Sequence, residues 1–300
     1  MKNRCLCIDV GGSSIKYALI DNELNLYKKG SVVTPNTNIE DYVNALCSIY
    51  EKFRDEVYGI ALSVPGIIDS KNGLCITGGS LLFIEKFNIV EVLQDKCGVP
   101  ISVMNDAKCA SLAEAKWGAL SDCNDGIVIV LGTGIGGAII KDKKIHQGKH
   151  FGAGEFSFIN LNNEFDGDEN KWFNANGNLK LISLVSKAKG IDASKLDGYK
   201  IFEMAKVGDE IVLKVIDKFT RSIANMILNL QLIYDPDKFA IGGGISSQPL
   251  LLEYINKNVD FYNSISNPIL PKPDVVACKF YNDSNLIGAY ANYLNMHSEN

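Results

Sequence analysis

The sequence lacks the features that mark nucleic-acid-binding and membrane-spanning proteins. Its 30 Lys and Arg are outnumbered by 35 Asp and Glu, the formal net charge is -5, and no basic cluster is present to bind a phosphate backbone. No apolar run approaches the roughly 18 residues that a membrane-spanning helix needs. The first residues show no charged segment followed by an apolar one, as a secretory signal would. We expect a soluble, cytoplasmic protein that binds neither nucleic acid nor membranes.

Clustered cysteines are also missing. The eight cysteines are scattered, mostly inside apolar runs, which is typical of a reduced protein with thiols in its core. Only Cys5 and Cys7 lie close in sequence, and they alternate within a predicted strand. Their side chains therefore face opposite ways and cannot bind one metal ion without a turn. We interpret both as core residues.

The chain is long enough, at 300 residues and 46% hydrophobic, for two domains with large cores. It opens with a meander of three predicted strands, near residues 5–10, 15–20 and 27–33. The pattern of strand, glycine turn and strand restarts in the second half, near residues 127–131, 138–141 and 144–148. We interpret this repeat as an internal structural duplication, with a domain boundary near residues 118–125.

Helices and strands alternate through the rest of the chain. Asn38 is predicted to cap a helix that ends near Asp55, and Asn88 a helix that ends near Cys97. Further strands are predicted at residues 59–64, 100–104, 239–241 and 275–280. Further helices are predicted at residues 107–117, 179–188, 197–206, 209–234, 249–257 and 283–294. The polar, aperiodic residues 149–177 are predicted to be a loop-rich insertion.

Asp106 stands between an apolar strand and an Ala-rich helix. This is the position at which α/β folds place ligands, because the carboxyl ends of strands there meet the amino ends of helices. A carboxylate at such a point can serve as a catalytic base or simply as a helix cap. The glycine-rich turns elsewhere in the chain favour the catalytic interpretation.

Three glycine-rich turns each follow a short apolar strand: residues 11–14, 132–137 and 242–244. Glycines let backbone N–H groups approach an anion with no Cβ in the way. Asp9 precedes the first turn, where it could hold a hydrated Mg²⁺, and Lys16 follows it as a positive charge. Any one turn is equally consistent with a hairpin that binds nothing, but two such hairpins indicate a nucleotide clamp. The third turn would let adenine and ribose lie on its backbone.

The second turn formally contains G-x-G-x-x-G, the dinucleotide fingerprint. That fingerprint requires a helix to follow, because the pyrophosphate rests on the helix N-terminus. Here the β-branched residues 138–143 follow, so we predict a β-hairpin instead. The chain also has no P-loop G-x-x-x-x-G-K-[ST].

These segments resemble, in order and spacing, the motifs of the ROK family of sugar kinases and repressors, within the actin-like ATPase superfamily. The matching motifs are Asp9-Val10-Gly11-Gly12-Ser13-Ser14-Ile15-Lys16, Val64-Pro65-Gly66, Asn105-Asp106-Ala107, Leu131-Gly132-Thr133-Gly134-Ile135-Gly136-Gly137 and Ile241-Gly242-Gly243-Gly244-Ile245. The resemblance implies an α/β fold of two actin-like (ribonuclease H-like) domains with a sugar in the central cleft. We place these domains at residues 1–120 and 121–300, with the last helix, from about residue 283, as a candidate to pack back on the first.

The resemblance also implies the reaction: ATP and Mg²⁺ are the cosubstrates, and Asp106 is the base for phosphorylation of the sugar's 6-hydroxyl. The implied sugar-binding residues are Gly66, Gly78, Gly79, Asn105, Asp106 and Glu155. The implied ATP-binding residues are Gly11, Gly12, Ser13, Ser14, Lys16, Gly132, Thr133, Gly134, Gly136, Gly137, Gly242, Gly243 and Gly244. Asp9 is the candidate Mg²⁺ residue, acting through water.

Two departures from the family pattern change the expected site. Glu155-Phe156-Ser157-Phe158 stands where the family has Glu-x-Gly-His, and residues 161–177 contain none of the family's zinc-binding cysteines. No zinc is therefore expected. Residues 166–170 lack the glycine and glutamate of a calcium loop, so we interpret that acidic run as a solvated loop. Phe156, Phe158 and Trp172 could face the aglycone of a glucoside or could equally lie in the core.

These departures make the chain most similar to the zinc-less β-glucoside kinase branch, an ATP:sugar 6-phosphotransferase. N-acetylmannosamine kinase and glucokinase are the alternatives within the family, and a non-catalytic sugar sensor is the alternative of a different class. A repressor is disfavoured because the first strand begins by Cys5, with no helix-turn-helix before it. Family members are usually dimers, so a homodimer is expected.

Overall fold

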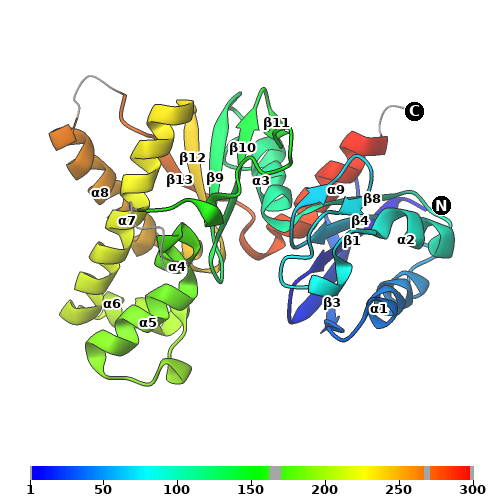
Figure 1. Ribbon diagram of the computed structural model, residues 1–300, viewed down its shortest axis with the longest axis horizontal. Helices are drawn as coiled ribbons and strands as arrows, with labels where there is room; N and C mark the ends of the chain where they lie inside the picture. Colours follow the sequence, from blue (N-terminus) through cyan, green and yellow to red (C-terminus); the bar gives the residue numbers. More distant parts are fainter. Residues whose placement is uncertain (1, 162–169, 267–270, 298–300) are drawn as a thin grey trace. The chain divides into compact units, whose positions relative to one another are not determined.

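The computed structural model describes residues 2–161, 170–266 and 271–297. It divides into two compact units (Figure 1). The first unit comprises Met1–Lys116, Gln147–Gly152 and Asp283–Asn300, and the second comprises Trp117–His146 and Ala153–Asn282. The two chain segments that return to the first unit come from the middle and the end of the sequence, so neither unit is a single continuous stretch.

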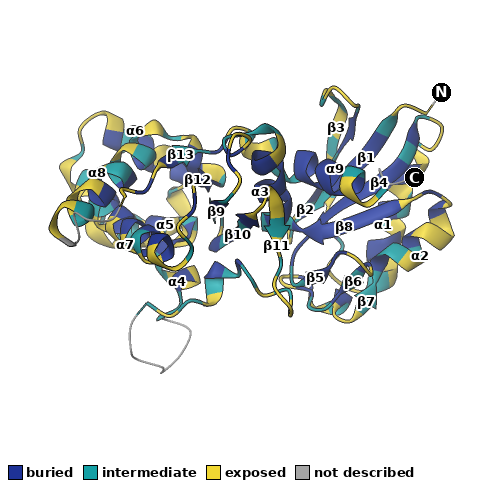
Figure 2. Cartoon of the chain, turned by 90° about the horizontal axis from the view of Figure 1, so that it is seen from above, coloured by how far each residue is buried: buried dark blue, intermediate teal, exposed yellow. Residues whose placement is uncertain are grey.

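A five-stranded mixed sheet forms the centre of the first unit, in the order β3-β2-β1-β4-β8. Its strands are β1 (Arg4–Val10), β2 (Ser14–Ile20), β3 (Leu26–Val33), β4 (Val57–Val64) and β8 (Ile101–Asn105). β1, β2 and β3 pair antiparallel, whereas β1, β4 and β8 run parallel. The parallel strands therefore end at one edge of the sheet. β8 is buried along its whole length (Figure 2).

The first unit also contains helices. They are α1 (Ile39–Glu51), α2 (Ile89–Cys97), α3 (Asp106–Trp117) and α9 (Ser284–His297). Apolar residues of α1 and α2 pack with Leu6 and Ile8 of β1, and α9 packs on β1, β4 and β8. A small antiparallel sheet of β5 (Ile68–Asp69), β6 (Leu74–Cys75) and β7 (Phe87–Asn88) follows β4.

The second unit repeats the same strand order, β11-β10-β9-β12-β13. Its strands are β9 (Gly126–Leu131), β10 (Ile135–Lys141), β11 (Lys144–His146), β12 (Lys238–Gly242) and β13 (Val275–Ala277). β9, β10 and β11 pair antiparallel, and β9, β12 and β13 pair parallel, as their counterparts do in the first unit. The predicted structural duplication is confirmed at the level of topology.

The helices of the second unit lie mostly between β11 and β12 in sequence. They are α4 (Trp172–Asn176), α5 (Asn178–Lys189), α6 (Gly198–Lys206), α7 (Glu210–Tyr234) and α8 (Pro249–Ser266), with short 3-10 turns at η2 (Phe156–Phe158), η4 (Ala193–Lys195) and η5 (Gly244–Ser247). Within the described residues, no helix is both long and apolar enough to cross a bilayer.

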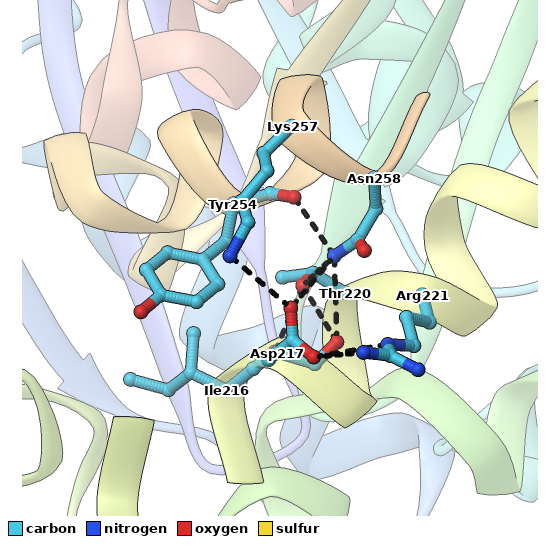
Figure 3. Close-up of polar contacts among 7 residues, drawn as sticks. All are labelled: Ile216, Asp217, Thr220, Arg221, Tyr254, Lys257 and Asn258. Atoms are coloured by element: carbon cyan, nitrogen blue, oxygen red, sulfur yellow. Dashed lines mark hydrogen bonds and ion pairs between the residues drawn. The ribbon is translucent and has the colours of Figure 1, made fainter. Parts of the chain in front are cut away.

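α7 and α8 pack side by side and are joined by polar contacts as well as apolar ones (Figure 3). Asn258 of α8 is buried, and its Nδ2 donates to Oγ1 of Thr220 at 3.0 Å. Asp217 of α7 accepts from Nε and Nη2 of Arg221 at 2.9 and 2.6 Å and faces Nζ of Lys257 at 3.9 Å. Because α8 follows η5 directly, this packing fixes the polypeptide that leaves the third glycine turn.

The predicted N-terminal caps of two helices are confirmed. Asn38 caps α1 and Asn88 caps α2, each accepting a backbone N–H three residues on, at 2.8 and 3.1 Å. Asp209 caps α7, which ends at Tyr234 as predicted. Seven of the eight cysteines are buried and Cys47 is half-buried, as expected for core thiols. Burial raises the pKa of the Cys75 thiol to about 12.

Several predicted boundaries are wrong. α1 ends at Glu51, four residues before Asp55. α8 continues past Lys257 to Ser266, because its buried positions Leu251, Ile255 and Val259 keep helical spacing. β13 ends at Ala277 rather than at 280, ahead of a turn in which Tyr281 has a positive φ of 44°. The strand at Phe87–Asn88 is too short to have a sequence signal. In the predicted loop region, residues 162–169, including the acidic run up to 169, lie outside the described residues.

Gly288 gives a test of how α9 is seated on the first unit. A Cβ at this position would clash with the backbone carbonyl of Cys109 in α3. Because neither backbone can move away easily, we expect Gly288→Ala to lower the free energy of unfolding by about 1–3 kcal/mol. Asn295→Ala, on the exposed side of the same helix, should change it by no more than about 0.5 kcal/mol. Urea denaturation of both variants measures the difference, and equal stabilities would contradict the close α9–α3 packing.

Candidate active site

Asn105 and Asp106 form the junction between β8 and α3. Oδ1 of Asn105 accepts the backbone N–H of Lys108 at 3.0 Å, so Asn105 is the residue that caps α3. Nδ2 of Asn105 donates to Oδ1 of Asp106 at 2.9 Å, and the N–H of Ala107 donates to the same oxygen at 2.8 Å. Asn105, and not Asp106, therefore caps α3. The half-exposed carboxylate of Asp106 is held in a fixed orientation by its two donors.

The three glycines predicted to bind the sugar lie together, next to Asn105. Nδ2 of Asn105 also donates to the carbonyl of Gly66 at 2.9 Å. Gly66 has a φ of 97°, and a Cβ there would clash with the carbonyl of Thr77 and lie 2.8 Å from the N of Gly79. The segments that follow β4 and β6 are therefore in backbone contact. Within the first unit, the structure brings Gly66, Gly78, Gly79, Asn105 and Asp106 into one cluster.

Asp9 lies at the same sheet edge, near the end of β1. Its Oδ1 accepts from Oγ of Ser63 at 2.8 Å and from Nδ2 of Asn285 at 2.9 Å. Ser63 pairs with Asp9 in register on one side and with Met104 on the other, which aligns Asp9 with the strand end that carries Asp106. Burial, followed by the charges of Asp9 and Asp106, raises the pKa of the Cys109 thiol. The carboxylates of Asp9 and Asp106 therefore both contribute to the raised pKa of the same buried thiol, that of Cys109.

The first glycine turn joins β1 to β2. The N–H of Gly11 donates to the carbonyl of Ser14 at 3.0 Å, and Oγ1 of Thr34 donates to the carbonyl of Gly11 at 2.7 Å. Gly12 and Ser13 are exposed. Lys16 is exposed and lies directly opposite Asp9 in the β1–β2 ladder, so the two side chains share one face of the sheet. The backbone of this turn is thus accessible beside one positive and one negative side chain.

The second glycine turn, in the second unit, is a β-hairpin, as predicted. β10 begins at Ile135, so Gly132, Thr133 and Gly134 form the turn, whereas Gly136 and Gly137 lie inside the strand opposite Val130 and Ile129. The expected strand start at 138 is therefore three residues late. Because a strand and not a helix follows, the G-x-G-x-x-G pattern is not a dinucleotide fingerprint here.

The second and third glycine turns lie next to each other. Gly243 has a φ of 95°, and a Cβ there would lie 2.7 Å from the backbone N of Leu131, the residue before the second turn. Oγ of Ser246 donates to the carbonyl of Gly243 at 2.8 Å. On the other side, the N–H of Asn178 donates to the carbonyl of Gly132 at 2.8 Å. The second unit thus gathers two glycine turns and the first residue of α5.

Glu155 and the aromatic residues beside it have separate environments. Glu155 is half-buried and directly precedes η2. Phe156 and Trp172 are 3% and 0% exposed, and their rings pack together in the core of the second unit. Phe158 is 61% exposed. Of the two interpretations left open for these aromatic side chains, the core one holds for Phe156 and Trp172.

Sequence reasoning missed the side chains that hold the predicted residues in place. Ser63 and Asn285 orient Asp9, and Lys108 is buried just beyond Asp106. Asn285 is 276 positions from Asp9, so no local pattern links them. Lys108 had a weak signal, since it is a charge in the first turn of an Ala-rich helix, two residues after the predicted base. No group of three or more His, Cys, Asp or Glu side chains suited to a metal ion occurs in the part of the chain that the structure describes.

Comparisons with known proteins identify relatives over nearly the whole chain. The model of the ROK family matches residues 5–295. The chain is 28% identical to a β-glucoside kinase of Listeria innocua, over 95% of this chain and 96% of that protein. It is 29% identical to a ROK family protein from Streptococcus pneumoniae whose crystal structure is a complex with sucrose, with a TM-score of 0.88 and 99% of each chain covered.

A ROK family glucokinase from Streptomyces griseus, in complex with glucose and AMPPNP, has the same fold. The TM-score is 0.84 at 24% identity, over 95% of this chain and 97% of that one. The predicted two-domain α/β fold class and the family resemblance are both confirmed by these similarities together with the two mixed five-stranded sheets.

The side chain of Asn105 makes three hydrogen bonds, to Gly66, Asp106 and Lys108. We therefore expect its replacement to have an unusually large effect on the free energy of unfolding. Asn105→Ala removes a helix cap, worth about 1 kcal/mol, and two further hydrogen bonds worth about 1 kcal/mol each. Asn88→Ala is the control: it removes the cap of α2 and one solvent-exposed hydrogen bond to the carbonyl of Asn72. In urea denaturation we expect a loss of about 2–3 kcal/mol for Asn105→Ala and about 1 kcal/mol for Asn88→Ala. Equal losses would mean that the bonds to Gly66 and Asp106 contribute nothing.

Proposed function

Because the chain belongs to the ROK family, we propose that it is an ATP-dependent sugar kinase that phosphorylates the 6-hydroxyl of a hexose unit, with β-glucosides as the preferred substrates. The observation that carries the proposal is the Asn105–Asp106 junction, where a half-exposed carboxylate is oriented by two donors beside the cluster of Gly66, Gly78 and Gly79. The β-glucoside kinase of Listeria innocua, similar over nearly the whole chain, supports the choice of substrate.

Asp106 acts as the general base in this mechanism. Its carboxylate accepts the proton of the 6-hydroxyl while the sugar oxygen attacks the γ-phosphorus of ATP, and the bond from that phosphorus to the β,γ-bridging oxygen breaks to release ADP. The bonds from Asn105 and Ala107 to Oδ1 fix the plane of the carboxylate before the sugar binds. A base positioned in advance lowers the entropic part of the barrier.

The sugar is held by the backbone of Gly66, Gly78 and Gly79 and by the side chains of Asn105 and Glu155 in our proposal. Asn105 already uses both of its amide hydrogens, on Gly66 and Asp106. Its contribution to sugar binding is therefore partly to fix these two partners. Glu155, half-buried at the start of η2, adds a charged acceptor for sugar hydroxyls.

ATP is bound by the glycine turns in this proposal. The N–H groups of Gly12, Ser13 and Ser14 and of Gly132, Thr133 and Gly134 face the phosphates, with Lys16 as a point charge. Gly11 belongs to the same phosphate turn and closes it, because its own N–H donates to the carbonyl of Ser14. Gly242, Gly243 and Gly244 lie against the adenosine. Gly136 and Gly137 are then part of the β10 strand that supports the turn.

Mg²⁺ fits the donor set at Asp9. A carboxylate oriented by a hydroxyl and an amide, as Asp9 is by Ser63 and Asn285, suits a hydrated Mg²⁺, which prefers few protein oxygens and several waters. Bound there, the ion would neutralise charge on the phosphate oxygens. We further propose that the protein needs no zinc, since residues 161–177 contain no cysteine. We also propose that it is a cytoplasmic homodimer.

Replacing the base should abolish turnover without loss of fold. We expect Asp106→Asn to lower kcat by about 10² to 10⁴-fold, while the melting temperature and the affinity for glucose in calorimetry stay near those of the wild type. Asp95→Asn, at an exposed carboxylate on α2, is the control for loss of one negative charge. A kcat of Asp106→Asn close to that of wild type would rule out the role of Asp106 as the base.

The substrate is tested by ADP release with cellobiose, aryl β-glucosides, glucose, N-acetylmannosamine, mannose and fructose. We expect the highest kcat/KM with a β-glucoside. Preference for N-acetylmannosamine or for glucose would replace the substrate but leave the role of Asp106 intact. Sugar binding in calorimetry with no ADP release from any sugar would instead identify a non-catalytic sugar sensor.

A further inference from the structure

Lys108 is a charged side chain in the interior of the first unit, only 1% exposed. It belongs to the first turn of α3, two residues after Asp106, and its backbone N–H bonds the capping side chain of Asn105. Its Nζ donates to the backbone carbonyl of Phe151 at 2.8 Å. Burial of an ammonium group is costly unless its hydrogen bonds are made. The position therefore demands strong local contacts, and the carbonyl of Phe151 is one of them.

Phe151 belongs to a short segment, Gln147–Gly152, that is part of the first unit although the chain on both sides of it belongs to the second. The bond from Lys108 ties this segment to the helix turn that carries Asp106. The side chain of Lys108 therefore links the backbone of Phe151, an aromatic residue, to the first turn of α3. It is half-buried, in contrast to Phe156 and Trp172, which lie in the core of the second unit.

The backbone of Phe151 is in the left-handed region, with a φ of 61°. This conformation is uncommon for a residue with a large side chain. Such strain persists where the surroundings impose it, often at ligand-binding positions. The bond from the buried Lys108 to the carbonyl of Phe151 is the kind of contact that imposes it. The chain thus keeps a strained phenylalanine at a point where glycine would be relaxed.

We propose that Phe151 is a specificity-determining residue whose ring packs against the group attached to C1 of a bound glucoside, and that Lys108 is the positioning residue that sets its backbone. The inference rests on the proposed sugar kinase function. An aromatic ring gives an apolar face to a second sugar or an aryl group. Free glucose carries no such group, so the contact favours glucosides over glucose and leaves the reaction at the 6-hydroxyl unchanged.

The decisive variant is Phe151→Gly. Glycine adopts a positive φ without strain and keeps the carbonyl that Lys108 holds, so the ring is removed and the backbone is retained. Loss of one apolar contact should lower kcat/KM for phenyl β-glucoside and cellobiose about tenfold relative to glucose. The kcat/KM for glucose and the KM for ATP should stay within about twofold of wild type, because the reacting groups are untouched.

Lys108→Met tests the positioning role. It should lower the glucoside-to-glucose ratio in the same direction as Phe151→Gly, and it should add nothing further when the two changes are combined, because both act through one ring. Melting temperatures show whether Lys108→Met is folded, and Phe151→Gly decides the proposal if it is not. Tyr199→Ala, at a 66% exposed aromatic residue of α6, is the matched control and should leave the ratio unchanged.

Three results would overturn the inference. An equal loss on glucose and glucosides would show that Phe151 has only a structural role. An unchanged ratio in Phe151→Gly would show that the ring does not meet the aglycone. A reduced ratio in Phe158→Ala, with none in Phe151→Gly, would assign the aglycone contact to the exposed Phe158 instead.

Failure of the proposed function has a different signature, namely wild-type protein that releases no ADP with any sugar. If wild-type protein releases no ADP, glucosides and glucose are compared by binding instead. Calorimetric titration of wild type and Phe151→Gly with phenyl β-glucoside and with glucose gives the ratio of the two dissociation constants for each protein. Weaker binding of phenyl β-glucoside alone in Phe151→Gly supports the inference, and equal binding by the two proteins overturns it.

Discussion

The side chain of Asn105 makes the interaction on which the candidate site of the first unit depends. Its carbonyl oxygen caps α3, and its two amide hydrogens hold Gly66 and Asp106. The start of α3, the segment at Gly66 and the Asp106 carboxylate are therefore fixed by one buried amide. An aspartate could replace the cap but not the two donations. The residue before the proposed base thus has the structural task, which leaves the base itself half-exposed.

The shared sheet topology explains where the proposed functional groups lie. In each unit two strands run parallel to the first one, so their carboxyl ends meet at a single edge. In the first unit this edge carries Asp9 and Asp106, and in the second it carries two glycine turns. A duplicated fold therefore supplies two equivalent sheet edges. The residues that follow the strands differ between the two units, and they determine which proposed functional groups each edge carries. The fold alone would not distinguish a kinase from a sensor.

Local features were predictable from the sequence, and long-range ones were not. The caps at Asn38 and Asn88 were found because a cap needs only a side chain and an N–H two or three residues away. The strand–turn–strand pattern around residue 133 excluded a dinucleotide fold for the same reason. The partners of Asp9 and of Lys108 come from 276 and 43 positions away, where no periodicity carries information. The burial of Phe156 and Trp172 likewise depended on packing against distant helices.

The glycines show why a motif predicts a site better than it predicts the role of each residue in it. A Cβ at Gly137 or Gly243 would clash with backbone carbonyls, and both residues have positive φ angles, so the fold itself requires glycine there. Gly132 and Gly244 differ. Their φ angles lie outside the left-handed region, and a Cβ at Gly132 would come no closer than 4.0 Å to a neighbouring atom, while at Gly244 it would meet nothing within that distance. Packing within the protein does not account for glycine at these two positions. The proposed binding of ATP would account for them through close approach of the nucleotide to the backbone, and the two turns that contain them are adjacent through Leu131.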